Sequence, residues 1–422
     1  MSPATFDPVN RPWVTRLRSV VRRTVLVTFG LQILLAVSLT LVDSYRRRGK
    51  KPKPFTTTPP SDVSIGEGVV TSYTFGSDLY EDMLAAIAGA QSQVLLESYI
   101  WKSDEIGERF KQALYDAADR GVEVYAIYDG FANLVVSPRF KHFRPPVRVL
   151  RYPVYAAGLA FFDLRRYGRD HRKILVVDDE VAFVGGYNLG SAFATEWRDT
   201  HVRITGPGVW DLKRAFADMW NLHRRGRHAG PLLLETPSDW EPRIRVHRNV
   251  PRLWMFPIRA MYLEAINRAT SHVYLTQAYF IPDQNIVDAL TDASRRGVDV
   301  RVLVPRTSNH VVADWLSQGY YGELLGAGVK IFRFQDAMVH AKTATIDGAW
   351  STVGTANIDR LSMTGNYEVN VEFIDGAMAQ QMERIFAQDL ENCEQLTLVE
   401  WSSRGIYKRL VEMFLAPLRP LL

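Results

Sequence analysis

Two stretches of the chain repeat the same order of hydrophobic and polar positions. Residues 93–130 and 272–306 each give an apolar β-like run, a stretch with helical spacing, the sequence Arg-Gly-Val and a second alternating run. Gly121 and Gly297 lie where the C-caps of the two helices are expected. This order predicts a βαβ unit in each stretch. The repetition predicts an internal duplication of the α/β class, in which each half is a mixed β-sheet flanked by helices.

A different pattern comes before the repeat. The run Thr24–Val42 has no charged residue, and basic residues flank it on both sides. As a helix it would be about 28 Å long, close to the ~30 Å hydrocarbon core of a bilayer. It therefore predicts a transmembrane anchor. A cleaved export signal after Arg22-Arg23 and a buried core helix are the alternatives. Since both flanks are basic, the charge rule for membrane proteins leaves the orientation open.

These patterns divide the chain into segments. Residues 49–61 are rich in proline and threonine, as expected of a linker. The last segment has apolar residues at near-helical spacing among basic ones, so its helix is expected either to pack on the core or to lie in a membrane interface. The predicted segments are a basic N-terminus (1–23), a transmembrane helix (24–42), a linker (43–62), two α/β domains (63–233 and 234–398) and a C-terminal amphipathic helix (399–422).

Composition narrows the class of protein. The chain has 422 residues, of which 47% are hydrophobic and 23% charged, a globular balance that allows two domains. Cys393 is the single cysteine, so no intrachain disulfide can form. The formal net charge is +5, and basic and aromatic residues gather in residues 139–155. That cluster indicates either a contact with anionic lipid or an ordinary solvated loop.

Each half then carries one copy of a polar pattern. The pattern is a histidine, one residue, a lysine, four residues and an aspartate, followed by a small-residue pair, an asparagine and a more distant acid. The histidine and lysine alternate, so they are expected to share one face of a strand. The residues are His171, Lys173, Asp178, Asn188 and Asp199 in the first copy, and His340, Lys342, Asp347, Asn357 and Glu368 in the second.

Two histidines and two lysines suit the chemistry of a phosphodiester. A neutral imidazole can act as a nucleophile or as a general acid and base. Lysines hold the non-bridging oxygens as charge shifts, and Asn188 and Asn357 can donate hydrogen bonds to the same oxygens. Asp199 and Glu368 lie equally far from their histidines, and each is expected to accept a hydrogen bond from the far ring nitrogen of a histidine.

Other uses of these residues are less well supported. Asp178 and Asp347 end their strands on a turn, so we expect them to be mainly structural and to bond backbone or lysine. A metal site is disfavoured because each histidine has a lysine beside it, and a fixed cation next to a metal ion is unfavourable. No phosphate-binding or dinucleotide-binding fingerprint occurs at a strand–helix junction. We therefore predict neither a metal nor another cofactor.

The paired pattern resembles that of the phospholipase D superfamily over residues 63–395. Within that superfamily the chain is similar to bacterial cardiolipin synthases, through the sequence RRYGRDHRKILVVDD, the N-terminal hydrophobic segment and the tail that ends in Pro-Leu-Leu. Such synthases often carry two N-terminal membrane segments, and this chain has one clear candidate. The resemblance implies two tandem phospholipase D-like domains behind an N-terminal transmembrane helix.

The resemblance also implies a reaction. His171 would attack phosphorus to form a phosphatidyl-histidine, and His340 would serve as acid and base, although the symmetry of the pattern does not distinguish them. Two phosphatidylglycerol molecules would give cardiolipin and glycerol without a cofactor. The six motif residues, including Asp178 and Asp347, would form the catalytic set. The arginines just before the first histidine would contact headgroup phosphate; they are Arg165, Arg166 and Arg169.

Partners and location follow from the same resemblance. We expect an anionic phospholipid as substrate, no nucleic acid, and a single pass through the bacterial cytoplasmic membrane with the catalytic domain facing the cytoplasm. The oligomeric state stays open. A hydrolytic phospholipase D would use the same residues with water as acceptor, and a nuclease of the superfamily would use them on nucleic acid. A non-enzymatic scaffold is disfavoured because neither copy has lost its histidine or lysine.

Overall fold

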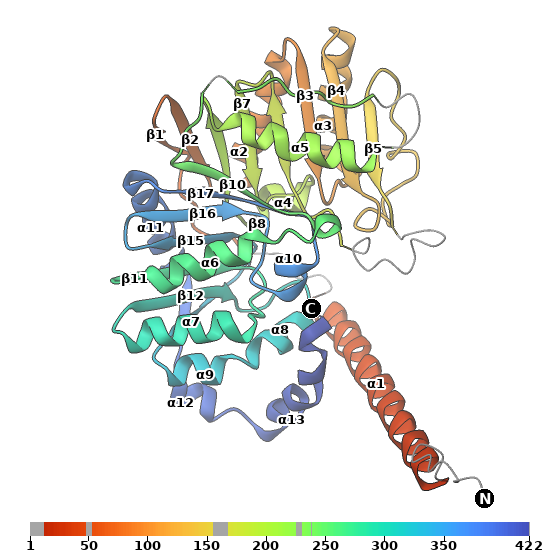
Figure 1. Ribbon diagram of the computed structural model, residues 1–422, viewed down its shortest axis with the longest axis vertical. Helices are drawn as coiled ribbons and strands as arrows, with labels where there is room; N and C mark the ends of the chain where they lie inside the picture. The colour runs from red at the N-terminus through yellow and green to blue at the C-terminus, as the bar shows by residue number, and fades with distance from the viewer. Residues whose placement is uncertain (1–11, 48–52, 155–167, 225–229, 238, 422) are drawn as a thin grey trace, which may run out of the picture.

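The computed structural model describes residues 12–47, 53–154, 168–224, 230–237 and 239–421. It has two α/β halves stacked on one another and a long helix, α1 (Pro12–Arg47), that projects from them (Figure 1). Each half contains a sheet of eight strands, parallel in one part and antiparallel in the rest. The predicted duplication of a mixed sheet flanked by helices is confirmed.

The first half forms the sheet in the order β1-β2-β9-β7-β6-β3-β4-β5. Strands β3, β4 and β5 run parallel, and their neighbours are antiparallel. The elements are β1 (Ser61–Ile65), β2 (Gly68–Tyr73), α2 (Gly76–Gly89), β3 (Gln93–Ser98), α3 (Glu105–Asp119), β4 (Glu123–Asp129), β5 (Arg148–Tyr152), β6 (Ile174–Val177), β7 (Val181–Gly185), α4 (Ser191–Thr195), β8 (Trp197–Arg198), β9 (His201–Thr205) and α5 (Val209–His223).

The second half repeats this plan in the order β10-β17-β16-β15-β11-β12-β13-β18. Its elements are β10 (Ile244–Asn249), η4 (Pro251–Leu253), α6 (Pro257–Arg268), β11 (His272–Gln277), α7 (Gln284–Arg295), β12 (Asp299–Pro305), α8 (Val311–Gln318), α9 (Tyr321–Gly326), β13 (Lys330–Phe334), β14 (Met338–Val339), β15 (Lys342–Ile346), β16 (Trp350–Gly354), α10 (Arg360–Thr364), β17 (Glu368–Phe373), α11 (Gly376–Leu390), β18 (Cys393–Leu396), α12 (Leu398–Ser402), α13 (Ile406–Leu415) and η5 (Ala416–Leu421).

The two βαβ units form as the hydrophobic pattern predicted. In each unit an aspartate caps the helix: Asp104 accepts from the backbone of Gly107, and Asp283 accepts from the backbone of Ile286. The helices end before Gly121 and Gly297, whose φ angles of 91° and 92° suit glycine. The strands on either side of each helix are parallel neighbours, which places both strand ends at the edge where the halves meet.

One apolar core joins the halves. Buried side chains of β7, β9 and α5 in the first half pack with those of β16, β17 and α11 in the second half. Val184, Val202, Val353 and Val371 are completely buried in this cluster. Since protein interiors are close-packed, a shared core fixes the halves relative to each other. Side chains on the facing strand ends are therefore held at fixed distances.

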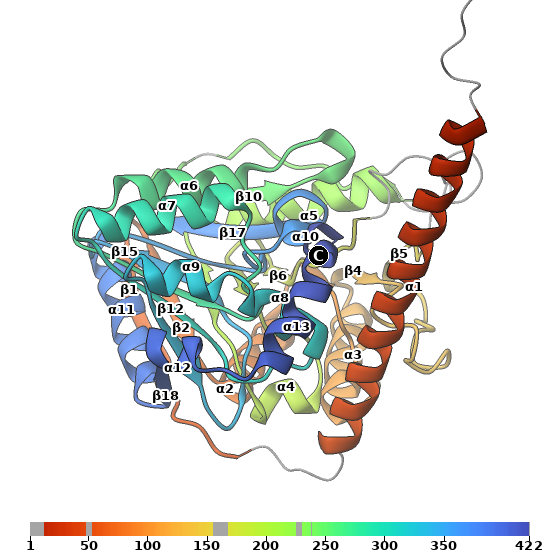
Figure 2. The same cartoon turned by 90° about the horizontal axis from the view of Figure 1, so that it is seen from below.

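The N-terminal and C-terminal helices meet beside α8. Leu35 and Leu39 of α1 pack with Val312 of α8 and Val411 of α13. The amide of Gln32 donates to the carbonyl of Phe414, 2.8 Å away. Figure 2 shows α13 against α8, with α1 running past the body. Within the described part of the chain, no helix combines the length and apolarity that a bilayer crossing requires.

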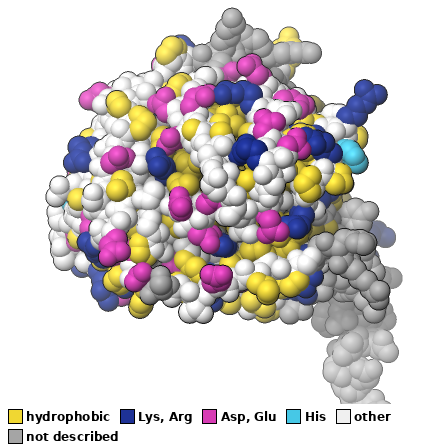
Figure 3. Space-filling view, turned by 90° about the horizontal axis from the view of Figure 1, so that it is seen from above, with side chains coloured by type: hydrophobic (Ala, Val, Ile, Leu, Met, Phe, Trp, Pro, Cys, Tyr) yellow, Lys and Arg dark blue, Asp and Glu magenta, His cyan; other side chains and the backbone are white. Residues whose placement is uncertain are grey.

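Acidic and basic side chains are interspersed over the face of the molecule seen in Figure 3. The ion pairs of the surface include Arg144 with Asp119 and Arg148 with Glu123. Both arginines belong to the basic and aromatic cluster at residues 139–155. Each is neutralised by an acid of the same half, so this part of the cluster contributes little net positive charge to the surface.

Candidate active site

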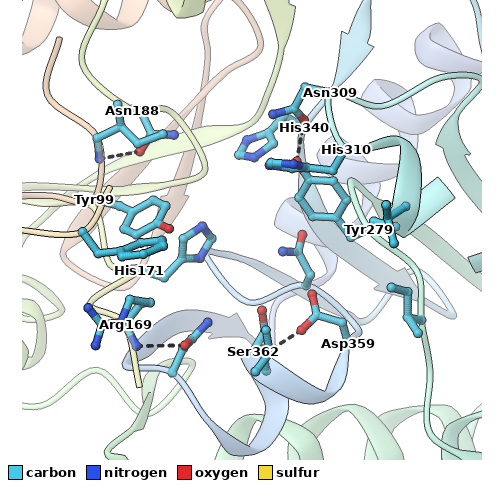
Figure 4. Close-up of a pocket in the computed structure, with 18 of the residues that line it drawn as sticks. Tyr99, Arg169, His171, Asn188, Tyr279, Asn309, His310, His340, Asp359 and Ser362 are labelled. Carbon is cyan, nitrogen blue, oxygen red and sulfur yellow. Dashed lines mark hydrogen bonds between the residues drawn. The ribbon is translucent and has the colours of Figure 1, made fainter. Parts of the chain in front are cut away.

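His171 and His340 face one cleft between the halves. The cleft has a volume of about 710 Å³, and both histidines line it together with Asn188 and Asn357 (Figure 4). The rings are largely enclosed, with 12% and 6% of the two side chains exposed. The duplication thus places both histidines at a single site, as the phosphodiester chemistry requires.

Each histidine is held by an acid of the opposite half. Nδ1 of His171 lies 3.0 Å from Oε2 of Glu368, and Nδ1 of His340 lies 2.6 Å from Oδ2 of Asp199. The sequence pattern left open which histidine each acid serves, and the structure pairs each acid with the histidine of the other copy. The predicted chemistry is retained, because an acid on Nδ1 fixes the tautomer and leaves Nε2 available in the cleft.

Backbone pairing between the halves explains the exchange. The N–H of His171 donates to the carbonyl of Tyr367, directly before Glu368, at 3.0 Å. The N–H of His340 donates to the carbonyl of Arg198, directly before Asp199, at 2.6 Å. Each histidine is thereby held against the segment that carries the other half's acid.

This pairing also corrects the predicted strand of the first copy. β6 begins at Ile174, so His171 and Lys173 precede the strand; β15 begins at Lys342, after His340. The residues before each histidine pair across the interface instead: Asp170 forms a bridge with Tyr367, and β14 pairs with β8. The backbone N–H and C=O groups just before β6 and β15 therefore bond to the other half and do not lengthen these two strands.

Both imidazoles are kept neutral by their surroundings. Burial, reinforced by Lys173 and Lys342, lowers the pKa of His171 well below its usual value. Burial and Lys342 lower the pKa of His340 to about 3. A neutral ring is the form that can attack phosphorus or accept a proton.

The two orienting acids differ. Burial raises the pKa of Glu368 to about 7. Burial also opposes ionisation of Asp199, but Lys342 and His340 outweigh it and lower the pKa of that carboxyl. Asp199 is therefore the stronger counter-ion for a histidine that takes up a proton, which distinguishes His340 from His171.

The two lysines lie beneath the histidines. Nζ of Lys173 donates to the carbonyl of His171 at 2.6 Å, and Nζ of Lys342 donates to the carbonyl of His340. Both side chains are buried, and burial lowers the pKa of Lys173 to about 7 and that of Lys342 to about 8. The protein interior screens charge poorly, so the positive charge of these lysines acts across the short distance to the cleft. It favours the binding of an anion between the histidines.

The two aspartates of the motif are directed away from the cleft. Asp178 accepts from the backbone amides of Gln91, Ser92 and Gln93 at 2.6 to 2.8 Å. Asp347 accepts in the same way from three amides at the start of β11. We assign both to structure, because they fix the turn after the histidine strand onto the neighbouring strand. The catalytic role that the motif implies for them is not retained.

The asparagines and arginines of the predicted site fall into three groups. Oδ1 of Asn188 accepts from the backbone of Ile100 at 3.1 Å, whereas Oδ1 of Asn357 is buried without a hydrogen-bond partner in the described structure. Arg169 lines the cleft, and its Nη1 donates to the carbonyls of Pro153 and Val154. The other two predicted headgroup contacts lie outside the described residues; they are Arg165 and Arg166.

Sequence reasoning missed several residues of the cleft. Tyr99 meets the edge of His171 with ring centroids 4.7 Å apart, and Trp197 meets His340 at 5.0 Å. Tyr99 directly follows β3, and residues at the ends of strands that point to the interface were a signal that could have found it. Other polar or aromatic side chains that line the cleft include Tyr279, Asn309, His310 and Asp359.

Known proteins resemble this chain over most of its length. The family described as cardiolipin synthase, PLD-like domain, matches residues 83–220 and 262–390. A cardiolipin synthase of Clostridium perfringens strain SM101 is 31% identical over 365 residues, which cover 83% of this chain and 76% of the relative. One of Listeria monocytogenes serotype 4a strain HCC23 is 30% identical over 377 residues, with coverages of 83% and 75%.

A solved structure shares the fold. The phosphatidylserine synthase of Haemophilus influenzae Rd KW20 superposes with a TM-score of 0.64 at 12% identity. The match covers 86% of this chain and 95% of that protein. At this identity the likeness is one of architecture, and it extends over both halves.

Proposed function

Because the chain belongs to the family of cardiolipin synthases with PLD-like domains, we propose that it joins two phosphatidylglycerol molecules into cardiolipin and releases glycerol. The reaction class, transfer of a phosphatidyl group, follows from that membership. The observation that carries the proposal is the pair of neutral histidines in one cleft, each oriented through Nδ1 by a buried acid. This arrangement provides a nucleophile and a separate proton carrier on either side of one phosphorus atom.

His171 is the proposed nucleophile. Its Nε2 forms a bond to phosphorus while the bond from phosphorus to the glycerol oxygen breaks, which leaves a phosphatidyl-histidine. Glu368, whose pKa burial raises to about 7, imposes less negative charge on this ring than Asp199 imposes on the other. The charges of Lys173 and Lys342 favour the anionic phosphoryl oxygens during the transfer.

His340 is the proposed acid and base. Paired with ionised Asp199, it is the ring better able to carry a proton. When the anionic phosphodiester binds, Nε2 of His340 takes up a proton from solvent and then gives it to the departing glycerol oxygen. In the second step the neutral ring takes a proton from the hydroxyl of the second phosphatidylglycerol. That hydroxyl forms a new bond to phosphorus as the bond to His171 breaks, so the enzyme returns to its starting state.

The location is proposed on the same basis. Bacterial cardiolipin synthases are membrane enzymes, and α1 exposes Val27, Leu31, Leu34 and Leu41, each more than half exposed. Such a surface is stabilised by lipid. We propose the uncharged run at residues 24–42, which lies within α1, as the single pass in the cytoplasmic membrane on the strength of its sequence, with the catalytic halves on the cytoplasmic side. The exposed apolar face of α13 would then lie in the interface.

Purified enzyme and vesicles of phosphatidylglycerol test the function directly. We expect cardiolipin and free glycerol in equal amounts by mass spectrometry, with turnover unchanged by a chelator of divalent metals. His171→Ala should serve as the inactive control. Phosphatidic acid as the main product would replace the synthase with a hydrolase, and cleavage of nucleic acid with lipid untouched would overturn the substrate class.

A further inference from the structure

One wall of the cleft carries polar groups that the duplicated motif does not supply. Tyr279, Asn309 and His310 all belong to the second half and line the cleft (Figure 4). The hydroxyl of Tyr279 donates to Oδ1 of Asn309 at 2.5 Å. That bond leaves Nδ2 of the amide to donate to a ligand. The ring of Tyr279 lies 5.6 Å from that of His310 and 6.2 Å from that of His340, between centroids.

The loop that presents these groups is firmly built. Ser308 is completely buried, and its backbone N–H donates to Oδ2 of Asp314 at 2.9 Å. The N–H of Asp314 in turn donates to the carbonyl of His310 at 3.1 Å. Asn309 and His310, between these anchors, remain exposed. Because Ser308 is buried and bonded, the two residues after it, Asn309 and His310, are held in position at the cleft.

The first half has no such group at the corresponding positions. β4 and β12 start at matching places in their sheets, so Asn133 and Leu134 correspond to Asn309 and His310. Asn133 is 1% exposed, and its amide is used entirely by the backbone of Trp101, Tyr99 and Asp129. The polar wall is therefore an addition to the second half and not a consequence of the duplication.

We propose that Tyr279, Asn309 and His310 form the subsite for the glycerol hydroxyls of the alcohol that accepts the phosphatidyl group. The inference rests on the proposed function and deepens it. Side chains that donate and accept hydrogen bonds suit a polyol, which carries hydroxyls but no charge. The subsite adjoins His340, so a bound glycerol hydroxyl has its proton beside the proposed base. As that proton moves to His340, the oxygen bonds to phosphorus and the bond from phosphorus to His171 breaks.

The subsite also explains how transfer competes with hydrolysis. Water can also enter the cleft, but only a polyol can form hydrogen bonds with Asn309 and His310 at the same time. The departing glycerol of the first step leaves from the same place, because each step is the reverse of the other with a different alcohol. The preference for polyol over simple alcohol is therefore set by this wall.

A competition between two alcohols tests this inference. Enzyme acting on phosphatidylglycerol vesicles receives deuterated glycerol and 1-propanol at equal concentration, and mass spectrometry measures the two phosphatidyl alcohols. Their ratio depends only on the second step. We expect the wild type to prefer glycerol, and Asn309→Ala and His310→Ala each to lower that preference about threefold to tenfold, the worth of one neutral hydrogen bond. Tyr279→Phe should lower it less, because it removes only the group that orients Asn309.

Thr307→Ala is the matched control, since Thr307 is an exposed neighbour on the same loop outside the cleft. It should keep the wild-type ratio. Unchanged ratios in both Asn309→Ala and His310→Ala, with transfer intact, would overturn the subsite alone. A wild-type enzyme that transfers to neither alcohol would overturn the proposed function and the subsite with it.

Discussion

The two halves of this protein are most alike around the histidines and lysines of the repeated motif and least alike in the walls of the cleft between them. In both halves a histidine stands before a strand, a lysine bonds back to the carbonyl of that histidine, and an aspartate fixes the following turn. In both, an acid reaches across to the other half. The proposed reaction needs these groups twice, because one histidine holds phosphorus while the other moves protons.

The two halves differ in the buried residues next to the motif histidines. In the first half Arg172 is 2% exposed and donates to Glu97 at 2.6 Å, next to buried Asp170. The second half has Ala341 and Thr276 at the places of the arginine and the glutamate. The walls differ as well, since the second half alone places α8 and the polar loop before it beside the cleft. The two copies therefore differ at positions that have no part in the proposed transfer at phosphorus.

The largest effect is expected from breaking the division of labour between the histidines. His171→Ala and His340→Ala should each lower turnover at least ~10⁴-fold, because neither role can be filled by the other ring. Acid quenching during turnover should trap a phosphohistidine at position 171, mapped by mass spectrometry. A trapped group at position 340 would reverse the assignment of the two halves.

The ion pair found in the first half alone gives the next largest effect, on stability. Arg172→Met should lower the free energy of unfolding by about 3 to 5 kcal/mol, because it leaves Glu97 buried without its counter-charge. Chemical denaturation measures this change. The double variant Arg172→Ala and Glu97→Thr, which introduces the residues of the second half, should be less destabilised than the sum of the single variants Arg172→Ala and Glu97→Thr. Strict additivity would show that the two side chains are not coupled.

Removing the exchanged acids tests the coupling between the halves. Glu368→Gln and Asp199→Asn should each lower turnover about 10²-fold while the fold is kept, through loss of control over the histidine tautomer. Glu368→Gln should slow the formation of the phosphohistidine, because Glu368 orients His171. Glu372→Gln is the matched control: it breaks a histidine–glutamate pair of 2.8 Å with His247, outside the cleft. Normal turnover in both acid variants would leave them a structural role alone.

The smallest effect is expected on the inhibition of the enzyme by an anion, through the positive charges of Lys173 and Lys342. Burial lowers the pKa of Lys173 to about 7 and that of Lys342 to about 8, so both gain their positive charge as the pH falls from 9 to 6. Sulfate, whose charge is constant over this range, should inhibit about tenfold more strongly at pH 6 than at pH 9. Steady-state inhibition constants measure this, and Lys173→Met should flatten the profile.

Lys213→Met provides the comparison for the sulfate profile. Lys213 pairs with Asp179 on the surface, and neither lines the cleft. This variant should retain the pH dependence of the wild type. A flat profile in the wild type would mean that the buried lysines do not interact with the anion.

Much of the fold could be read from the chain. The βαβ units, their helix ends at Gly121 and Gly297, and the duplication were all predicted, because hydrophobic periodicity and glycine act over a few residues and leave a local record. The histidines and lysines were found for a related reason: one short pattern occurs twice. A repeated pattern can be recognised in the sequence without any knowledge of the tertiary structure.

Other features depended on contacts between segments far apart in the chain. The partner of each orienting acid is set by backbone bonds from His171 to Tyr367 and from His340 to Arg198. Nothing in the local pattern specifies pairing between the halves, so the spacing could not tell which acid serves which histidine. The wall formed by Asn309 and His310 was missed because it occurs once and has no counterpart to reveal it.

By itself, then, the sequence determined the duplicated domains, the two histidine–lysine pairs and the presence of a helix over residues 24–42, since local spacing or repetition indicates each of them. The tertiary structure alone decided which acid serves which histidine, that Asp178 and Asp347 hold turns, and that α1 meets the last helix through Gln32. The physical reason is the same in each case. These contacts arise from packing two halves around one shared core, and the energy of that packing depends on surfaces that come together only when the whole chain has folded.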